Sequence, residues 1–329
     1  MTWIRSLVAL AISSTAALAA PRPVVLDVDP GIDDALAILL ALRSPELEVR
    51  AVTVVFGNVE LELGVSNALK ILELAGRSDI PVGRGEAGPL VGEPLTAKNV
   101  HGENGLGNVR LPEPKAKLYE GSALRLIAET LEASSEPVTL LPVGPLTNIA
   151  LFLKLHPELT PKIREIVSMG GSAAAPGTVG PTVSFNILND PEAAAIVYRS
   201  GIPVTMVGLD VTSKTVLTPE RVSAFARSLD PVERFVGAVV GFHREVRGAE
   251  GVVVHDPLAV GAVVDPSFLS AELLPVDVEL RGELTRGQMV VDRRADATWR
   301  RGAPRSTRVA LDVEAERFLE FLIGRLAAR

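Results

Sequence analysis

Short β-branched segments alternate with longer helical segments through most of this 329-residue chain, and this alternation constrains the fold most strongly. The apolar runs are typical of buried strands, and the segments between them repeat their apolar residues with a helical period. The pattern predicts an α/β fold that has an open, mainly parallel, Rossmann-like central sheet with helices on both faces. Strands are expected at 24–28, 49–55, 80–82, 137–143, 163–169 and 204–209, and helices at 33–43, 60–75, 121–133, 146–155, 192–199, 218–228 and 313–326.

Two segments interrupt the alternation and are long for simple connections. Residues 83–115 are rich in glycine, proline and polar side chains, and residues 172–185 form a second such loop. The loops that follow parallel strands meet at one edge of the sheet, where such folds bind ligands. A hairpin is expected after residue 279, and no linker divides the chain. Residues 21–329 are therefore expected to form a single domain.

Residues 1–20 differ from the rest of the chain. Arg5 precedes an apolar run over 7–12, and small residues follow and end in Ala17-Leu18-Ala19, as in a cleavable signal peptide. The run is too short to span a bilayer, which takes about 20 apolar residues. An uncleaved anchor and a misassigned start are the alternatives. The segment predicts export, to the periplasm or the medium, without a stable membrane anchor.

Composition narrows the possible chemistry. Forty acidic against thirty-three basic residues give a net charge of −7, without basic blocks, which argues against nucleic acid as a partner. The absence of cysteine excludes disulfides, zinc–cysteine sites and thiol nucleophiles. Any histidine chemistry must come from four residues, and one of them, His156, precedes a proline where a helix end is expected.

An acidic cluster lies where the first expected strand ends. Asp27 and Asp29 end the strand, and Asp33 and Asp34 open the next helix, whose dipole favours negative charge there. Such close carboxylates repel one another unless a cation or protons neutralise them. Without a nearby cysteine or histidine, an oxygen-only site indicates a hard ion, Ca²⁺ or Mg²⁺. Structural strand-end and helix-capping roles would explain one of the second pair but not the whole cluster.

The spacing of Asp27 and Asp29 also allows a phosphatase of the haloacid dehalogenase type, in which the first aspartate accepts the phosphoryl group. In this chain, however, Pro30-Gly31 follows directly, and a further aspartate pair comes after it. That arrangement disfavours the phosphatase.

The segment DVDPGIDDALAI resembles the DTDPGxDDAxAI signature of the nucleoside hydrolases, the inosine–uridine-preferring nucleoside N-ribohydrolases. Further family segments follow in the same order: FGN at 56–58, HGENGLG at 101–107, PVGPLTNIA at 142–150, FN at 185–186, DPEAA at 190–194, VHDP at 254–257 and GELTRGQMVVD at 282–292. The resemblance implies a nucleoside hydrolase-like fold. It also implies Ca²⁺-dependent hydrolysis of the N-glycosidic bond of ribonucleosides, or related ribosides, to ribose and a free base.

The resemblance also implies the ion's ligands. Asp29 would bind Ca²⁺ and act as the base for the attacking water, and Asp34 and Asp256 would be further carboxylate ligands. The main-chain carbonyl of Val143 would complete the protein ligands, and Asp27 would orient its neighbours. Because Ca²⁺ accepts six to eight oxygens, water and the sugar's vicinal hydroxyls can fill the remaining positions.

Ribose contacts are implied for Asp33, at the 2′-hydroxyl, and for Asn58 and Asn186. Taken by itself, Asn58 could equally cap the helix that follows it.

The resemblance implies that histidines act on the nucleobase. His255 is the candidate acid that protonates the departing base. His101 opens a glycine-rich segment that resembles a mobile flap over the nucleobase. His243 is either a pocket residue or a solvated helix residue.

The chain departs from the family before FN, where an Asn and, six residues later, a Glu normally bind sugar hydroxyls, chiefly on the 5′ side. Thr178 and Ser184 occupy these positions. Both replacements weaken the hydrogen bonds available to the ribose. They predict a riboside that is not a standard nucleoside, or one whose 5′ end is weakly recognised.

A second hypothesis is a secreted riboside-binding protein of the same fold with little catalysis. Thr178, Ser184 and the leader support it, whereas the retained base, ion ligands and His255 favour the enzyme. The family resemblance further suggests a homodimer or homotetramer.

Overall fold

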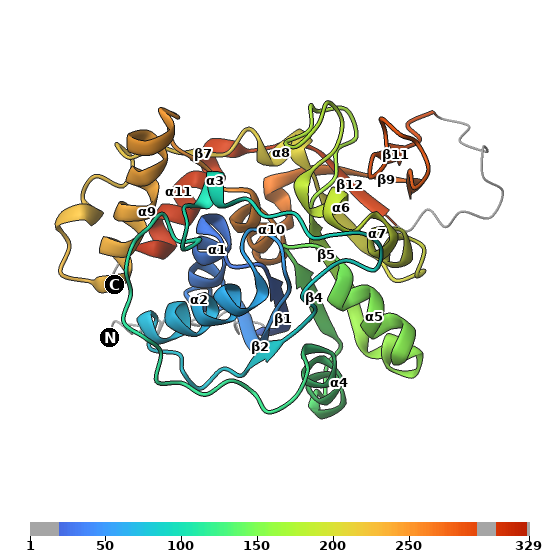
Figure 1. Ribbon diagram of the computed structural model, residues 1–329, viewed down its shortest axis with the longest axis horizontal. Helices are drawn as coiled ribbons and strands as arrows, with labels where there is room; N and C mark the ends of the chain where they lie inside the picture. Colours follow the sequence, from blue (N-terminus) through green and yellow to red (C-terminus); the bar gives the residue numbers. More distant parts are fainter. Residues whose placement is uncertain (1–19, 295–306, 328–329) are drawn as a thin grey trace, which may run out of the picture.

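The computed structural model describes residues 20–294 and 307–327, so the expected signal peptide, except for its last residue, lies outside the described residues. Eight strands form one sheet in the order β3-β2-β1-β4-β5-β6-β12-β9, and all neighbours pair in parallel except β12 and β9 (Figure 1). The predicted mainly parallel α/β sheet is confirmed. The strands of this sheet are β1 (Arg22–Val28), β2 (Leu47–Val54), β3 (Val82–Arg84), β4 (Val138–Pro142), β5 (Ile163–Met169), β6 (Val204–Val207), β9 (Leu269–Leu274) and β12 (Thr307–Val313).

Helices cover both faces of the sheet and enclose two hydrophobic cores. One core contains Val24, Leu26 and Val28 with residues of α1, α2, α9, α10 and α11, and the other contains Val25 with residues of α4, α5 and α7. Successive side chains of β1 thus alternate between the two cores, as the pleat of a strand requires. The helices are α1 (Ile32–Leu42), α2 (Leu61–Leu74), α3 (Lys98–His101), α4 (Ala123–Ala133), α5 (Thr147–Leu155), α6 (Phe185–Asn189), α7 (Pro191–Tyr198), α8 (Leu209–Thr212), α9 (Pro231–Arg247), α10 (His255–Val264) and α11 (Ala315–Leu326).

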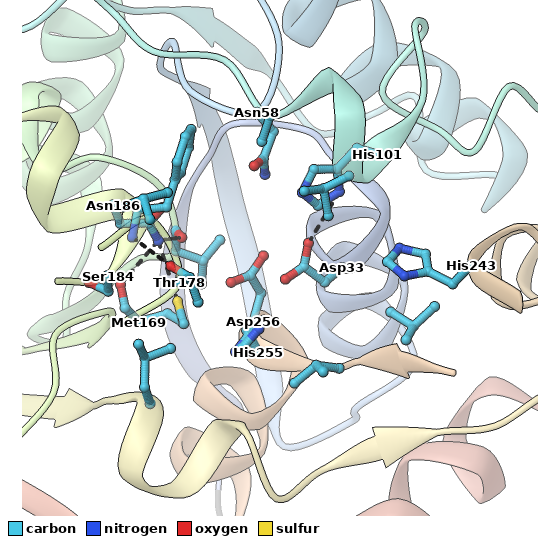
Figure 2. Close-up of a pocket in the computed structure, with 18 of the residues that line it drawn as sticks. Asp33, Asn58, His101, Met169, Thr178, Ser184, Asn186, His243, His255 and Asp256 are labelled. Atoms are coloured by element: carbon cyan, nitrogen blue, oxygen red, sulfur yellow. Dashed lines mark hydrogen bonds and ion pairs between the residues drawn. The ribbon is translucent and has the colours of Figure 1, made fainter. Parts of the chain in front are cut away.

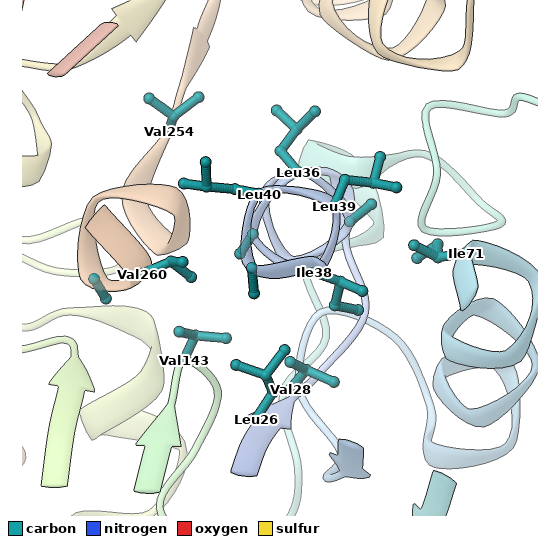
Figure 3. Close-up of a cluster of buried hydrophobic side chains, with 14 of the residues drawn as sticks. Leu26, Val28, Leu36, Ile38, Leu39, Leu40, Ile71, Val143, Val254 and Val260 are labelled. Atoms are coloured by element: carbon teal, nitrogen blue, oxygen red, sulfur yellow. The ribbon is translucent and has the colours of Figure 1, made fainter. Parts of the chain in front are cut away.

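Helix α1 is buried along almost its whole length, from Ile32 to Ala41. Leu36, Leu39 and Leu40 point in different directions around the helix, toward neighbouring elements that include α2 and α10 (Figure 3). A helix that is apolar on all sides is stable only inside a core, and each such side chain contributes about 1.5–3 kcal/mol by burial. The helix therefore holds the aspartates of its first turn on a rigid support.

Several predictions from the sequence need correction. Residues 218–228, expected to be helical, form turns and a short 3₁₀ helix, η2 (Phe225–Arg227), because only Val222 and Phe225 of this segment supply large buried side chains. The sequence pattern also missed α9, α10, β9 and β12. One short helix, α3, lies within the loop expected at 83–115, and another, α6, begins where the loop expected at 172–185 ends. The expected hairpin is confirmed as β10 (Val276–Val278) paired with β11 (Met289–Val291); β7 (Val216–Leu217) and β8 (Val252–Val253) form another small antiparallel pair.

Among the described residues, no helix has the length and apolar character needed to cross a membrane. The carboxyl ends of β1, β2, β4 and β5 lead directly into the segments that carry Asp29, Asn58, Val143 and Gly170. The topology therefore gathers loops from four neighbouring strands at one edge of the sheet.

Candidate active site

Asp34 fixes the geometry of the first loop. One of its carboxylate oxygens, Oδ1, accepts a hydrogen bond from the Asp29 amide at 3.0 Å. The other, Oδ2, accepts from the Gly31 amide at 3.0 Å and from Nδ2 of Asn58 at 2.9 Å. These donors hold the charged carboxylate at the N-terminus of α1, where the helix dipole stabilises it.

Asp29 is enclosed by glycines. Its Oδ2 accepts from the Asn58 amide at 2.7 Å, whereas its Oδ1 is buried without a hydrogen-bond partner in the described part of the chain. A Cβ at Gly144 would lie 2.6 Å from Oδ1, and one at Gly57 would lie 2.0 Å from Oδ2. Only glycine permits this approach. A buried carboxylate oxygen without a donor needs a cation or a proton.

Three carboxylates form a group that can hold a metal ion. Oxygens of Asp33, Asp34 and Asp256 lie within 4.8 Å of one another, and all three residues are buried. Burial, reinforced by the charge of Asp34, raises the pKa of Asp33 to about 8. Burial and the charges of the other aspartates raise the pKa of Asp256 well above its usual range, and the same causes act on Asp29. Raised pKa values mean that these carboxyls do not readily ionise together without a nearby positive charge. Their oxygen ligands suit a hard divalent cation, which would supply that charge.

The structure thus brings two of the predicted ligands, Asp34 and Asp256, together with Asp33. The third, Asp29, is not part of this group of three, but its backbone amide donates to Asp34. Val143 follows β4 and lines the same cavity. Its amide donates to the Asp27 carbonyl at 2.8 Å, and its carbonyl accepts from Nδ2 of Asn186. A carbonyl has two lone pairs, so this bond leaves one for another partner.

Asp27 belongs to a separate buried network. Its Oδ1 accepts from Oγ1 of Thr53 at 2.6 Å and from Nδ2 of Asn148 at 2.7 Å, and burial raises the pKa of this carboxyl to about 7. Asn148 also accepts from the Glu86 amide, so it ties β1 to the loop after β3. Sequence reasoning missed Asn148, although it lies within the PVGPLTNIA segment, because its partners are distant in sequence.

A cavity of about 460 Å³ opens above this cluster (Figure 2). Its lining includes most of the predicted site residues, namely Asp33, Asn58, His101, Val143, Thr178, Ser184, Asn186, His255 and Asp256. It also includes residues that the sequence did not single out, among them Met169 at the end of β5 and Leu209 just after β6. Their positions after parallel strands are the signal that could have indicated them.

Asn58 is not the cap of the next helix. The N-cap position of α2 is Glu60, which makes no side-chain capping bond. Asn58 instead donates from both its backbone and its side chain to Asp29 and Asp34. Its amide side chain therefore stabilises the carboxylates and lines the cavity beside them.

His101 binds the start of α1. Its Nδ1 accepts from the Ile32 amide at 3.0 Å and lies 3.8 Å from Oδ1 of Asp33. Because an acceptor nitrogen carries no proton, the neutral ring has its proton on Nε2. The glycine-rich segment after it is tied to the same region, since Asn67 donates to the carbonyls of Pro30 and Asn104.

His255 lies beside Asp256 at the start of α10, with Nδ1 2.8 Å from Oγ1 of Thr212. Burial lowers the pKa of His255 to about 4, so the ring is neutral at neutral pH. His243 is buried and lines the cavity, so it is a pocket residue rather than a solvated one. His156, as expected, occupies the C-cap position of a helix, α5.

Thr178 and Ser184 lie together with Asn186 on one side of the cavity (Figure 2). Oγ of Ser184 accepts from the Gly171 amide at 2.7 Å, and Oγ1 of Thr178 accepts from the Phe185 amide at 3.1 Å. Both hydroxyls therefore support the loop's own backbone.

The family profile for the inosine-uridine preferring nucleoside hydrolases matches residues 24–320. The chain is 44% identical over 311 residues to a pyrimidine-specific ribonucleoside hydrolase, RihA, of Photobacterium profundum, with 93% of this chain and 99% of the relative covered. Among solved structures, it resembles the purine-preferring ribonucleoside hydrolase of Gardnerella vaginalis, with a TM-score of 0.86, 34% identity and coverage of 93% and 98%. A plant nucleoside hydrolase, PpNRh1, gives a TM-score of 0.87 at 34% identity, with 94% and 100% covered.

These matches span nearly the whole chain, and they agree with a cavity built over buried carboxylates at the carboxyl edge of a parallel sheet. The chain therefore belongs to the inosine–uridine-preferring nucleoside hydrolase family and is a hydrolase of ribonucleoside N-glycosidic bonds.

Proposed function

We propose that this protein is an exported, Ca²⁺-dependent hydrolase that cleaves the bond between the ribose and the base of a nucleoside or related riboside. The observation that carries the proposal is the buried group of carboxylates beneath the cavity, with one Asp29 oxygen lacking a donor among the described residues. Asp29, Asp34, Asp256 and the Val143 carbonyl would hold the ion. Oxygen-only ligands of this charge suit Ca²⁺.

In the reaction, Asp29 accepts a proton from the attacking water, and Asp33 accepts a hydrogen bond from the ribose 2′-hydroxyl. A bound divalent cation supplies orientation of that water and a lower barrier to its deprotonation. As the glycosidic bond breaks, positive charge grows on the ribosyl carbon, and the surrounding carboxylates stabilise it. Asn58 and Asn186 position the sugar. No covalent intermediate is required.

The departing base gains negative charge and must be stabilised. His255 lines the cavity and is the group to which we assign this role. In the tautomer in which the Thr212 hydroxyl donates to Nδ1, the neutral ring carries its proton on Nε2 and can donate a hydrogen bond that stabilises the departing base. To His101, whose Nε2 carries the proton and which also lines the cavity, we assign a hydrogen bond to the base.

A screen for ribose release tests the proposal. Uridine, cytidine, inosine and adenosine are incubated with the protein, with and without a chelator, and reducing sugar is measured. We expect turnover of at least one nucleoside, its loss with the chelator and its recovery with added Ca²⁺. Turnover that is unchanged by exhaustive chelation would contradict the ion dependence.

The alternative, a riboside-binding protein with little catalysis, is less well supported because the similar proteins are named as hydrolases. Calorimetry with ribosides, run beside the sugar assay, separates the two, since tight binding without ribose release would favour the binder. Export rests on the sequence of residues 1–20, and N-terminal sequencing of the protein from cell fractions tests it. The predicted homodimer or homotetramer is tested by light scattering.

A further inference from the structure

The cavity has two chemically different ends. Asp33, His101 and His243 lie on one side in Figure 2, and Asp256 lies between them and the other side. We call the other side the hydroxyl end, formed by Met169, Thr178, Ser184 and Asn186.

Ribose stereochemistry assigns a part of the substrate to each end. The 2′- and 3′-hydroxyls lie on one face of the ring, whereas the base on C1′ and the group on C5′ project from the opposite face at its two ends. C2′ adjoins C1′, so a 2′-hydroxyl held by Asp33 places C1′ and the base at the side of His101 and His243. C4′ and the C5′ group are then directed to the hydroxyl end. This step rests on the proposed function, which places the ribose over the carboxylates.

Each polar side chain of the hydroxyl end already makes a hydrogen bond to the backbone. Ser184 and Thr178 accept hydrogen bonds from the amides of Gly171 and Phe185. Nδ2 of Asn186 donates to the Val143 carbonyl and, at 3.3 Å, to the Met169 carbonyl. Each hydroxyl keeps its own O–H donor and a second lone pair, but none of the four residues of this end carries a charge, so a free 5′-hydroxyl would find only neutral partners there, whose net contribution is small.

Apolar residues line the cavity as well as these polar groups. The side chains of Met169, Val179 and Leu209 also line the cavity. Leu209 adjoins Ser184 through Gly171, whose carbonyl accepts from the Leu209 amide at 2.9 Å. A cavity of about 460 Å³ is within the range that binds whole small molecules, so a C5′ substituent has room.

A charged substituent does not fit. In the part of the chain that the structure describes, neither lysine nor arginine lines the cavity, whereas Asp33 and Asp256 do. A 5′-phosphate would carry about two negative charges into the cavity, where no cationic side chain of the described residues would receive it. We therefore expect the cavity to disfavour nucleotides.

We propose that the substrates are ribosides whose C5′ carries a small uncharged, apolar group, such as a 5′-deoxy or 5′-alkylthio group, in place of the free hydroxyl. Contact with Met169, Val179 and Leu209 then replaces hydrogen bonding as the source of affinity at this end. Thr178 and Ser184 are the residues that set this specificity.

The test compares uridine, 5′-deoxyuridine, 5′-methylthio-5′-deoxyuridine and uridine 5′-monophosphate. It also compares inosine with the inosine compounds that carry the same three changes at C5′. We expect kcat/KM for the 5′-deoxy and 5′-methylthio ribosides to equal or exceed that for the parent nucleoside, and the monophosphate to react at least about 100-fold more slowly. A preference of about 100-fold or more for the parent nucleoside, or efficient hydrolysis of the monophosphate, would overturn the proposal.

A variant provides the matched comparison. The double substitution Thr178→Asn with Ser184→Glu introduces groups that can bind a 5′-hydroxyl, and it should shift the preference toward the parent nucleoside by at least about tenfold. An unchanged preference in the folded variant would count against the role of these two residues. If the double variant does not fold, Thr178→Asn alone, at an exposed position, gives the same comparison.

Calorimetry keeps this inference separate from the proposed function. If none of the ribosides releases sugar, the hydrolase proposal fails. The dissociation constants of uridine and 5′-deoxyuridine, measured with Ca²⁺ present, still decide the C5′ preference. Binding of 5′-deoxyuridine at least as tight as that of uridine supports the inference, and binding about tenfold weaker or more contradicts it.

Discussion

The loops after β1 and after β5 both contribute polar side chains to one cavity, but they use them in opposite ways. After β1, backbone amides donate to the side chains of Asp29 and Asp34, and no lysine or arginine among the described residues lines the cavity beside them. After β5, backbone amides of Gly171 and Phe185 donate to Ser184 and Thr178, so neutral side chains serve the loop itself. The first loop therefore presents carboxylates for catalysis, whereas the side chains of the second stabilise the wall of the cavity.

The largest effect is expected at the carboxylate end. Asp29→Ala removes both a proposed ligand and the proposed base, and it should lower kcat/KM by about 10³-fold or more. It should also abolish Ca²⁺ binding measured by calorimetry. Asp79→Ala, which removes a carboxylate of an exposed ion pair, is the control and should change neither quantity. Ion affinity retained in the Asp29 variant would remove the contrast between the two loops.

His255, which begins α10, tests how the cavity stabilises the leaving group. His255→Ala should slow nucleosides, whose bases leave poorly, by about 10²-fold or more. Nitrophenyl riboside, whose nitrophenolate leaves without protonation, should react nearly as fast as it does with the unmodified protein. An equal loss for both substrates would exclude His255 as the group that stabilises the departing base.

The smallest expected effect concerns His101, which supports the carboxylate end from a distant loop. Asparagine can place an acceptor oxygen near the position of Nδ1, whereas glutamine places a donor near Nε2. His101→Gln should therefore lose the bond from the Ile32 amide and cost about 0.5–2 kcal/mol of unfolding free energy, and His101→Asn should lose less.

Thermal unfolding and hydrogen exchange at the Ile32 amide measure this difference. Faster exchange in His101→Gln than in His101→Asn is the expected result. Equal exchange in the two variants would show that His101 does not contribute to the start of α1.

Local features were predictable from the sequence. The helix expected at 33–43 is observed at Ile32–Leu42, because its aspartates and its continuous apolar run act within a few residues of one another. The helix expected at 218–228 failed, since its Thr-Pro start is a local signal and too few of its side chains reach a core. Strands β9 and β12 were missed; β12 pairs with the distant β6, and β9 pairs with β12.

The candidate site divides in the same way. The aspartates after β1 are contiguous in the chain, so their mutual repulsion, and hence the need for a cation or protons, followed from the sequence. The contact of Asp27 with Asn148 spans 121 residues, and that of Ile32 with His101 spans 69 residues. Such long-range pairs leave no local pattern in a single sequence.

The sequence by itself therefore determined the type of fold, the position of the acidic cluster and, through its motifs, the family. Only the tertiary structure decided that Asn58 supports the carboxylates rather than caps α2, and that the hydroxyls of Thr178 and Ser184 accept hydrogen bonds from the backbone. The physical reason is that spacing along the chain fixes which charges and apolar faces are neighbours. Hydrogen-bond partners and burial, which set the pKa values and the shape of the cavity, are fixed only when distant strands pair and helices pack.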